Sequence, residues 1–370
     1  MTAGRADEAT DRRAAHVLPL GPAVLYAGAL VAFAVAGLYG PVVNTLLAGL
    51  FLIAIVTGRL EAFVGDWAVF LAGLALFDSL RAGVFALVNS LELPVYMGYV
   101  IRLERALFGG ETLPTRLQAA LLRPDSPGAL VRLLVVAHAS HFVAFLLFGL
   151  GLWLARREAF GRFAAALLLV MSLGIVGHLA VPTVPPWMAA DLGAIPPVHR
   201  VADDVYGKAV PGLRRAFDTN PVAAMPSLHA AFPALLAFVG LHYAGARAWP
   251  LVVYLGLVSL AAVVLGEHYF LDIVAGVLLA AAAYWLLYRT RLVADRRRGA
   301  VRRGDPAGPS VARWSSPTGR RLVLAAALLV LAVGVSQATL RMRRPFTLPE
   351  TFVERELGGR PGGGPVCPRC

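Results

Sequence analysis

Long apolar runs separated by short polar segments make up most of this chain. A helix needs about 17–25 apolar residues, at about 1.5 Å each, to cross a bilayer. Runs of this length occur at residues 22–40, 41–58, 67–89, 130–154, 162–181, 226–244, 249–266, 269–288 and 321–340. The pattern therefore predicts an all-α, polytopic membrane bundle of about nine transmembrane helices.

The first apolar run has two interpretations. Gly40 and Pro41 break the helix between it and the second run. Ala34 and Ala36 resemble the small residues of a signal-peptide cleavage site, but the apolar core is longer than that of an ordinary signal peptide. We expect a retained helix, and cleavage would leave the orientation of the other helices unchanged.

Arginines predict the orientation of the bundle. The polar segment 289–321 is crowded with them, and short loops rich in Arg and Lys stay on the cytoplasmic side. Counting helices back from this loop places further arginines on the same side: Arg247, Arg156, Arg157, Arg162, Arg59, Arg12 and Arg13. Arg341, Arg343 and Arg344 and some arginines of the outer loops disagree. The outer connections, 90–129 and 182–225, are long enough that we expect them to cover something.

Composition agrees with a membrane protein. Only 15% of the residues are charged and 58% are hydrophobic, whereas a soluble domain has about a quarter charged residues. The net charge of +12 follows from the arginines between apolar runs. No nucleic-acid partner is expected, because the basic loop lacks interleaved aromatic residues beyond Trp314. Cys367 and Cys370 form a C-x-x-C in a Gly- and Pro-rich tail without further metal ligands nearby, so we expect a small disulfide at most.

The few ionisable residues within the apolar runs share one depth. Such residues are costly in lipid and usually mark a function. They fall in the outer half of five helices: Asp78, Arg81, His138, His141, His178, His229, His268 and Asp272. This predicts a single site. Structural explanations remain for some of them, because Asp78 and Arg81 at i,i+3 can neutralise each other, and His138 and His141 can be packing histidines.

The first candidate motif runs from Asn220 to His229 and reads Asn-Pro-Val-Ala-Ala-Met-Pro-Ser-Leu-His. Pro226 suits the first position of a helix. The N–H groups and the positive dipole end at that helix start would bind an anion. We therefore expect Ser227 to face a phosphate and His229 to donate a proton to a leaving oxygen.

The second motif, Gly266 to Asp272, reads Gly-Glu-His-Tyr-Phe-Leu-Asp. His268 and Asp272 are spaced i,i+4 and share a helical face. A carboxylate at one imidazole nitrogen fixes the tautomer and leaves the other nitrogen as a nucleophile. Glu267 points away from His268 and is expected to contact solvent or headgroups, whereas Tyr269 is a candidate substrate contact.

Alone, the spacing of His268 and Asp272 also suits a helix cap. The topology favours the catalytic interpretation. One helix runs inward from His229, the next returns, and the third begins at His268, so both histidines must lie at the same membrane face.

These residues resemble the type-2 phosphatidic acid phosphatase superfamily of lipid phosphatases and phosphotransferases. The resemblance covers roughly 66–290, and its specific part is 220–276. Pro-Ser-Leu-His in place of Pro-Ser-Gly-His, with the His-Tyr-Phe-Leu-Asp run, resembles the branch of inositol phosphorylceramide synthases. The resemblance implies a six-helix core, with His268 as the nucleophile forming a phosphohistidine, Asp272 as its orienter and His229 as acid and then base. It implies no metal or other cofactor.

The chain departs from the superfamily pattern where that pattern supplies its cations. Ala261 and Ala262 stand in place of a Ser-Arg pair, and the only K-x6-R, from Lys208 to Arg215, lies unusually close to Pro226. Something cationic should balance the charge of a transferred phosphoryl group. We expect Arg81 to do so, with Arg200 as the second candidate. The remaining candidates for substrate or phosphate binding are Asp78, His138 and His141.

The implied organisation has four parts. Residues 1–65 form a cytoplasmic segment and two extra helices, and 66–290 form the catalytic core. Residues 291–320 form the basic cytoplasmic loop, and 321–370 form the last helix and an extracytoplasmic tail.

The implied function is a lipid phosphotransferase of the inositol-phosphotransferase kind, integral to the cell membrane, with its site on the extracytoplasmic face. A membrane lipid would be the donor and a polyol or sugar the acceptor. A lipid phosphate or polyprenyl diphosphate phosphatase, with water as acceptor, shares the chemistry as far as the phosphohistidine, and only Leu228 favours transfer. A transporter or scaffold that has lost activity is the third interpretation.

Overall fold

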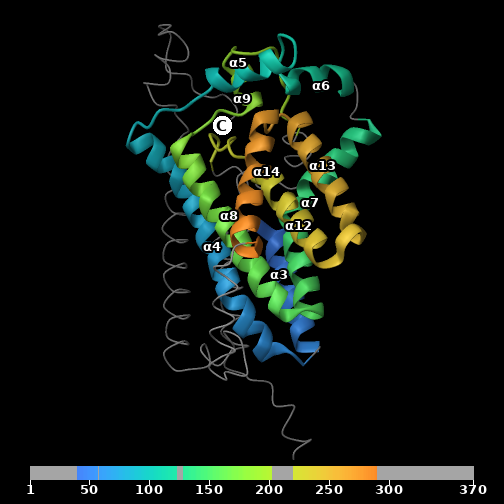
Figure 1. Ribbon diagram of the computed structural model, residues 1–370. Helices are drawn as coiled ribbons and strands as arrows, with labels where there is room; N and C mark the ends of the chain where they lie inside the picture. The colour runs from blue at the N-terminus through green and yellow to red at the C-terminus, as the bar shows by residue number, and fades with distance from the viewer. Residues whose placement is uncertain (1–39, 57, 123–127, 202–219, 290–370) are drawn as a thin grey trace, which may run out of the picture.

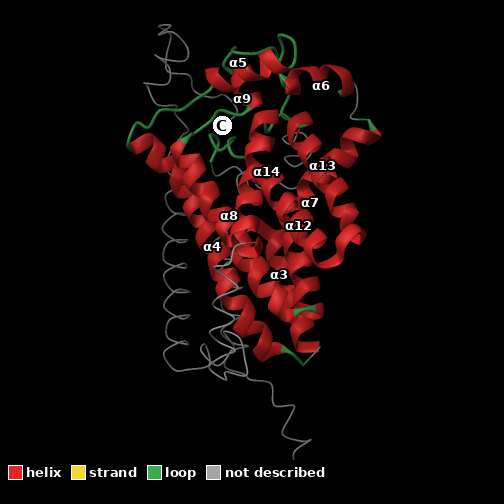
Figure 2. Cartoon of the chain, in the orientation of Figure 1, coloured by secondary structure: helices red, strands yellow, loops and turns green. Residues whose placement is uncertain are grey.

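The protein is helical throughout the part that the computed structural model describes, which is residues 40–56, 58–122, 128–201 and 220–289. Figure 2 shows these residues as helices joined by loops. No strand occurs among them, and only isolated bridges join Thr183 to Tyr96 and Ala223. The predicted all-α class is thus confirmed for the described residues.

The apolar runs form long helices that pack lengthwise (Figure 1). Their bounds follow the predicted runs closely: α3 (Gly40–Val56), α4 (Leu60–Ser90), α7 (Ala129–Ala155), α8 (Arg157–Ala180), α12 (Leu228–Ala244), α13 (Trp249–Val264) and α14 (Phe270–Tyr284). Short turns, η2 (Gly245–Ala248) and η3 (Trp285–Arg289), follow α12 and α14. Helix α12 packs against α14, α13, α7 and α8, which makes it central to the bundle.

Four helical runs are long and apolar enough to cross a membrane: 62–90, 157–180, 228–264 and 270–289. The two halves of α7 make a fifth if they are counted as one span. The run 228–264 joins α12 and α13 through η2, and these two helices pack against each other. The protein is therefore a multi-helix membrane protein. The runs expected at 22–40 and 321–340 lie outside the described residues, so the count of nine stays a prediction.

Helix α7 is bent by 55° between its halves Ala129–His141 and Val143–Ala155. The Ser140 hydroxyl donates a hydrogen bond to the Ala137 carbonyl at 2.7 Å, just before the bend. Such a side-chain bond to the preceding turn competes with the helical ladder and often accompanies bending. The bend places a change of direction immediately beside His141.

The two long connections contain three short helices: α5 (Gly98–Leu107), α6 (Leu113–Leu121) and α9 (Pro186–Asp191). Figure 1 shows all three at one end of the bundle, above the start of α14. We call α5, α6 and α9 the cap. The described parts of these connections are therefore folded elements at the end of the bundle where α12 and α14 begin.

Glycine allows an unusually close approach of α14 to the start of α12. A Cβ atom placed on Gly276 would lie 2.1 Å from the Ser227 carbonyl oxygen. The Ser227 N–H also donates to the Asp272 carbonyl at 3.0 Å. The two segments that carry the candidate motifs are thus held together backbone to backbone.

Candidate active site

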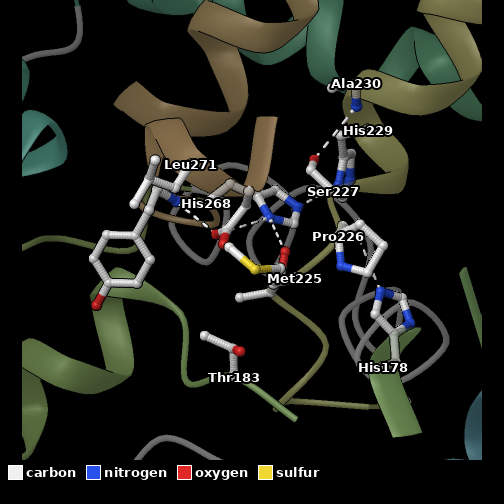
Figure 3. Close-up of polar contacts among 12 residues, drawn as sticks. His178, Thr183, Met225, Pro226, Ser227, His229, Ala230, His268 and Leu271 are labelled. Carbon is white, nitrogen blue, oxygen red and sulfur yellow. Dashed lines mark hydrogen bonds and ion pairs between the residues drawn. The ribbon is translucent and has the colours of Figure 1, made fainter. Parts of the chain in front are cut away.

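The two candidate catalytic histidines lie in direct contact. His229 is in the first turn of α12, and His268 lies just before Tyr269, the N-cap residue of α14. The Nδ1 atom of His229 lies 2.9 Å from the Nε2 atom of His268 (Figure 3). The structure therefore brings the two motifs together at the capped end of the bundle.

A backbone carbonyl determines the tautomer of His268. Its Nδ1 atom lies 2.9 Å from the Ala224 carbonyl oxygen, which can only accept a hydrogen bond. In the neutral ring Nδ1 therefore carries the proton, and Nε2 holds the lone pair. Because Nε2 faces His229 Nδ1, the latter must be the donor of the bond between the two rings. The Nε2 atom of His268, the expected nucleophile, thus faces Nδ1 of His229, the expected acid.

Asp272 lies behind His268 and is fully buried. Its Oδ2 atom is 3.6 Å from His268 Nδ1 and accepts the Tyr269 N–H at 2.8 Å. The carboxylate therefore stands at ion-pair distance from the imidazole while it also fixes the first turn of α14. Positive charge on the His268 ring would be stabilised there.

The α12 helix starts later than the sequence suggested. It begins at Leu228, and the Ser227 hydroxyl caps it by accepting the Ala230 N–H at 3.3 Å (Figure 3). The prediction that Pro226 takes the first helical position is therefore wrong. A serine cap satisfies a free helix N–H, and this contribution decides the boundary. The Pro226 carbonyl instead lies 3.0 Å from Nε2 of the buried His178.

His138 and His141 border the His229 ring. Their ring centroids lie 4.3 and 4.1 Å from that of His229, and the His138 ring is nearly parallel to it. His141 Nδ1 lies 2.7 Å from the His138 carbonyl, to which it donates. The bent segment of α7 therefore supplies two buried imidazoles to the same cluster.

Asp78 and Arg81 pair with each other on α4. The Arg81 Nη2 atom donates to Asp78 Oδ1 at 3.1 Å, as the i,i+3 spacing allows. Arg81 Nε is buried without a hydrogen-bond partner among the described residues. Arg81 lies close enough to His141, His178 and His229 for its charge to interact with their rings. This arginine thus lies beside the histidine cluster with donor capacity left over.

Arg200 is held on both sides by other residues. Its Nε and Nη2 atoms donate to the two carboxylate oxygens of Glu267 at 2.9 and 3.2 Å, and its guanidinium lies 4.3 Å from the centre of the Trp187 ring. The expectation that Glu267 contacts solvent or headgroups is wrong, because its side chain is only 15% exposed and pairs with Arg200. The helix starts at Phe270, so the helical angle used for Glu267 does not apply.

Tyr269 is buried in the apolar cluster that includes Trp187 and Val222. Its hydroxyl has no hydrogen-bond partner among the described residues, and its backbone N–H binds Asp272. Its backbone N–H thus joins it to Asp272, and a contact of its side chain with substrate stays a prediction.

The sequence profile of the PAP2 superfamily matches residues 99–286. The chain belongs to the PAP2 superfamily. It is therefore an enzyme of the type-2 phosphatidic acid phosphatase superfamily, as its motifs indicated. The phosphoinositol dihydroceramide synthase of Bacteroides thetaiotaomicron is 30% identical to it over 166 residues, which are 41% of this chain and 53% of the relative. The match thus spans about half the length of that relative. No solved structure matches the chain significantly.

This PAP2 enzyme lacks the superfamily arginine in its seventh predicted helix. Ala261 and Ala262, the residues that the resemblance assigns to the Ser-Arg pair, are fully buried near the end of α13 and supply no positive charge. Lys208 and Arg215 lie outside the described residues, as do Cys367 and Cys370. Among the cations that the structure describes, Arg81 and Arg200 are therefore the candidates that it places near the histidines.

Sequence reasoning missed the Ala224 carbonyl, since every residue has a carbonyl and no side-chain pattern marks this one. It also missed Glu104, a buried acid of the cap, because an isolated glutamate in an amphipathic segment resembles an ordinary surface residue.

Proposed function

We propose that this PAP2 enzyme is a lipid phosphotransferase that acts through a phosphohistidine on His268. The observation that carries the proposal is the contact of His229 Nδ1 with His268 Nε2 at 2.9 Å, with His268 Nδ1 bound to the Ala224 carbonyl. This arrangement supplies a nucleophilic lone pair and an acid within reach of one phosphorus atom.

In the first step the phosphorus of a lipid donor approaches His268 Nε2. Because 2.9 Å leaves no room for a phosphoryl group, the two rings must separate as the donor enters. The N–P bond forms and the bond from phosphorus to the lipid alcohol breaks. His229 enters this step as the imidazolium, with a proton on each ring nitrogen, and gives one proton to the departing oxygen. Asp272 stabilises the positive charge that develops on the His268 ring.

In the second step an alcohol takes the phosphoryl group. His229, now neutral, accepts the proton of the acceptor hydroxyl as the oxygen attacks phosphorus. The N–P bond breaks, and both histidines return to their starting states. The same nitrogen therefore acts first as acid and then as base.

The phosphoryl oxygens need positive partners, and Arg81 is our first choice. Its spare donors and its place beside the histidine cluster support this role. Arg200 ranks second, since Glu267 already neutralises it. His138 and His141 belong to the histidine cluster, and Asp78 pairs with Arg81. The Ser227 hydroxyl caps α12, and Tyr269 packs in the buried apolar cluster.

The relative's name supports a phosphoinositol group as the one transferred and a ceramide-type lipid alcohol as the acceptor. A polyol or sugar acceptor would use the same chemistry. We place the site on the extracytoplasmic face, since the arginines between the apolar runs orient the helices that way.

Product analysis with purified protein tests the proposal. Vesicles would carry fluorescent phosphatidylinositol with or without dihydroceramide. We expect headgroup transfer that depends on dihydroceramide, and a phosphoinositol adduct on His268 after brief exposure to the donor. His268→Gln should abolish both, whereas the control His242→Gln, at the far end of α12, should retain them. Headgroup release without transfer to any alcohol would favour a phosphatase, and turnover by His268→Gln would exclude this mechanism.

A further inference from the structure

One acidic side chain of the cap is directed into the protein. Glu104, in α5, is 0% exposed. A buried carboxyl group away from water costs free energy unless hydrogen-bond donors surround it. Its partners therefore indicate what it is there to hold.

Those partners are the starts of two different helices. Glu104 Oε1 accepts the Leu271 N–H of α14 at 3.2 Å, and Oε2 accepts the Leu113 N–H of α6 at 3.0 Å. The first N–H groups of a helix have no partner within the helix itself. One carboxyl group thus caps α6 and α14 together, with the positive ends of both helix dipoles directed at it.

The start of α14, which Glu104 binds, closely follows the proposed nucleophile His268 in the chain and so determines its position. Leu271 lies between His268 and Asp272 in the chain (Figure 3). Asp272 fixes this turn from within through the Tyr269 N–H. Glu104 fixes it from outside, from an element far away in the sequence. In the described part of the chain, the hydrogen bonds of the Glu104 carboxyl go to Leu271 and Leu113 and not to the His268 ring.

We propose that Glu104 is a positioning residue. From α5 it accepts a hydrogen bond from the first turn of α14, and it thereby holds His268 at the geometry required for attack on phosphorus. The kinetic part of this inference rests on the proposed function. The capping part stands without it. Loss of Glu104 removes the acceptors of the part-buried Leu271 and Leu113 N–H groups, so the first turn of α14 shifts relative to His229.

The test compares Glu104→Gln and Glu104→Ala with the wild type. Gln offers one acceptor oxygen where two N–H groups need one each, and it provides a second variant if the alanine variant does not fold. Glu111→Gln is the matched control, because Glu111 is an exposed acid of the same connection that pairs only loosely with Arg116, at 3.5 Å.

Kinetics would follow diacylglycerol released from fluorescent phosphatidylinositol in vesicles, a product that transfer and hydrolysis share. A displacement of about 1 Å at a reacting group costs up to about 100-fold in rate, so we expect kcat to fall roughly 10- to 100-fold in both Glu104 variants. KM should stay within about twofold, because the donor's own contacts are unchanged. The control should match the wild type.

Amide hydrogen exchange of peptides covering 266–275 and 110–117 tests the capping directly. We expect faster exchange in both peptides for the Glu104 variants and no change for Glu111→Gln. Unchanged exchange would overturn the capping, and faster exchange with unchanged kcat would overturn the positioning role. An inactive wild type would overturn the proposed function, while the exchange result would still decide whether Glu104 holds α14.

Discussion

The Ala224 carbonyl and the Asp272 carboxylate both contact the Nδ1 side of the His268 ring. Its Nδ1 atom is closer to the Ala224 carbonyl, at 2.9 Å, than to the Asp272 carboxylate, at 3.6 Å. The carbonyl therefore sets the tautomer, and the carboxylate adds charge. These two contributions can be separated experimentally.

Asp272→Asn should be slowed but not inactivated. In a serine protease, where a carboxylate sets the tautomer, the same change costs about 10⁴-fold because the ring takes the wrong tautomer. Here the Ala224 carbonyl keeps Nδ1 protonated, and the Asn oxygen can still accept the Tyr269 N–H. We expect kcat to fall about 10- to 100-fold with phosphohistidine still detectable after rapid quench. A loss as complete as that of His268→Gln would show that Asp272 sets the tautomer after all.

Glu104 predicts a pH effect on stability. Burial raises the pKa of its carboxyl above the ordinary value of 4.5, and the nearby Asp272 charge acts in the same direction. The backbone N–H bonds oppose this shift less strongly. Because the folded state holds the proton more tightly, the unfolded state ionises first, and stability falls as pH rises from about 4.5 through the raised pKa.

The measurement is the melting temperature in detergent between about pH 4 and pH 8 for the wild type and Glu104→Gln. We expect the wild-type curve to fall relative to that of the variant across the window above about 4.5. Curves that remain parallel there would mean that Glu104 titrates normally.

At the residue level the sequence indicated which side chains cluster but not all their partners. His229 and His268 lie at the starts of α12 and α14, and His138 and His141 lie in the first half of α7, so the four rings meet in the half of the bundle nearest the cap. The Arg200–Glu267 pair escaped prediction because it joins a connection to a segment just outside a helix, where periodicity has no meaning. Arginine and glutamate this far apart in the chain pair only through tertiary structure.

Among the elements, the contact between α12 and α14 determines the site geometry. Gly276 lies where a Cβ would be 2.1 Å from the Ser227 carbonyl, so Gly276→Ala must push the two helices apart. Overpacking of this kind costs about 1–3 kcal/mol. We expect a melting temperature lower by several degrees and a large loss of kcat, because His229 and His268 separate.

Gly256→Ala in α13 is the matched control, since its Cβ would have no atom within 4 Å. It should leave both the melting temperature and kcat near the wild-type values. Full activity of Gly276→Ala would show that the spacing of α12 and α14 does not limit the reaction.

Helix bounds could be predicted to within a few residues where the apolar runs are long, as for α8, α12 and α13. The cap helices could not, because α5 and α6 are short and only half apolar, a pattern that many surface loops share. The bend of α7 also escaped prediction: neither proline nor glycine marks residues 138–144, and a serine alone is a weak signal.

At the scale of the whole molecule, the arginine distribution predicts that the capped end faces away from the cytoplasm. Single cysteines introduced after Cys367→Ser and Cys370→Ser test this. Arg102→Cys, exposed on α5, should react with a membrane-impermeant maleimide on intact cells, whereas Arg247→Cys, exposed in η2 at the opposite end, should react only after lysis. The reverse pattern would invert the bundle and move the site to the cytoplasmic face.

Membership of the PAP2 superfamily could be recognised from a short segment, because the His229 and His268 motifs are specific. The run 228–264 holds two packed helices, as the separate apolar runs 226–244 and 249–266 predicted. The count of nine spans stays a prediction, since the runs expected at 22–40 and 321–340 lie outside the described residues. The four-part division of the chain therefore remains a prediction.

The bond between the two imidazoles has a chemical consequence for the idle enzyme. While His229 donates to His268 Nε2, the lone pair of that nitrogen is occupied by a hydrogen bond. It is therefore not available to react with electrophiles other than the substrate. Acylating reagents such as diethyl pyrocarbonate should therefore modify His268 slowly in the free enzyme, and faster once a bound donor lipid separates the two rings. His268 would then be unreactive in the free enzyme and become nucleophilic only when the substrate binds.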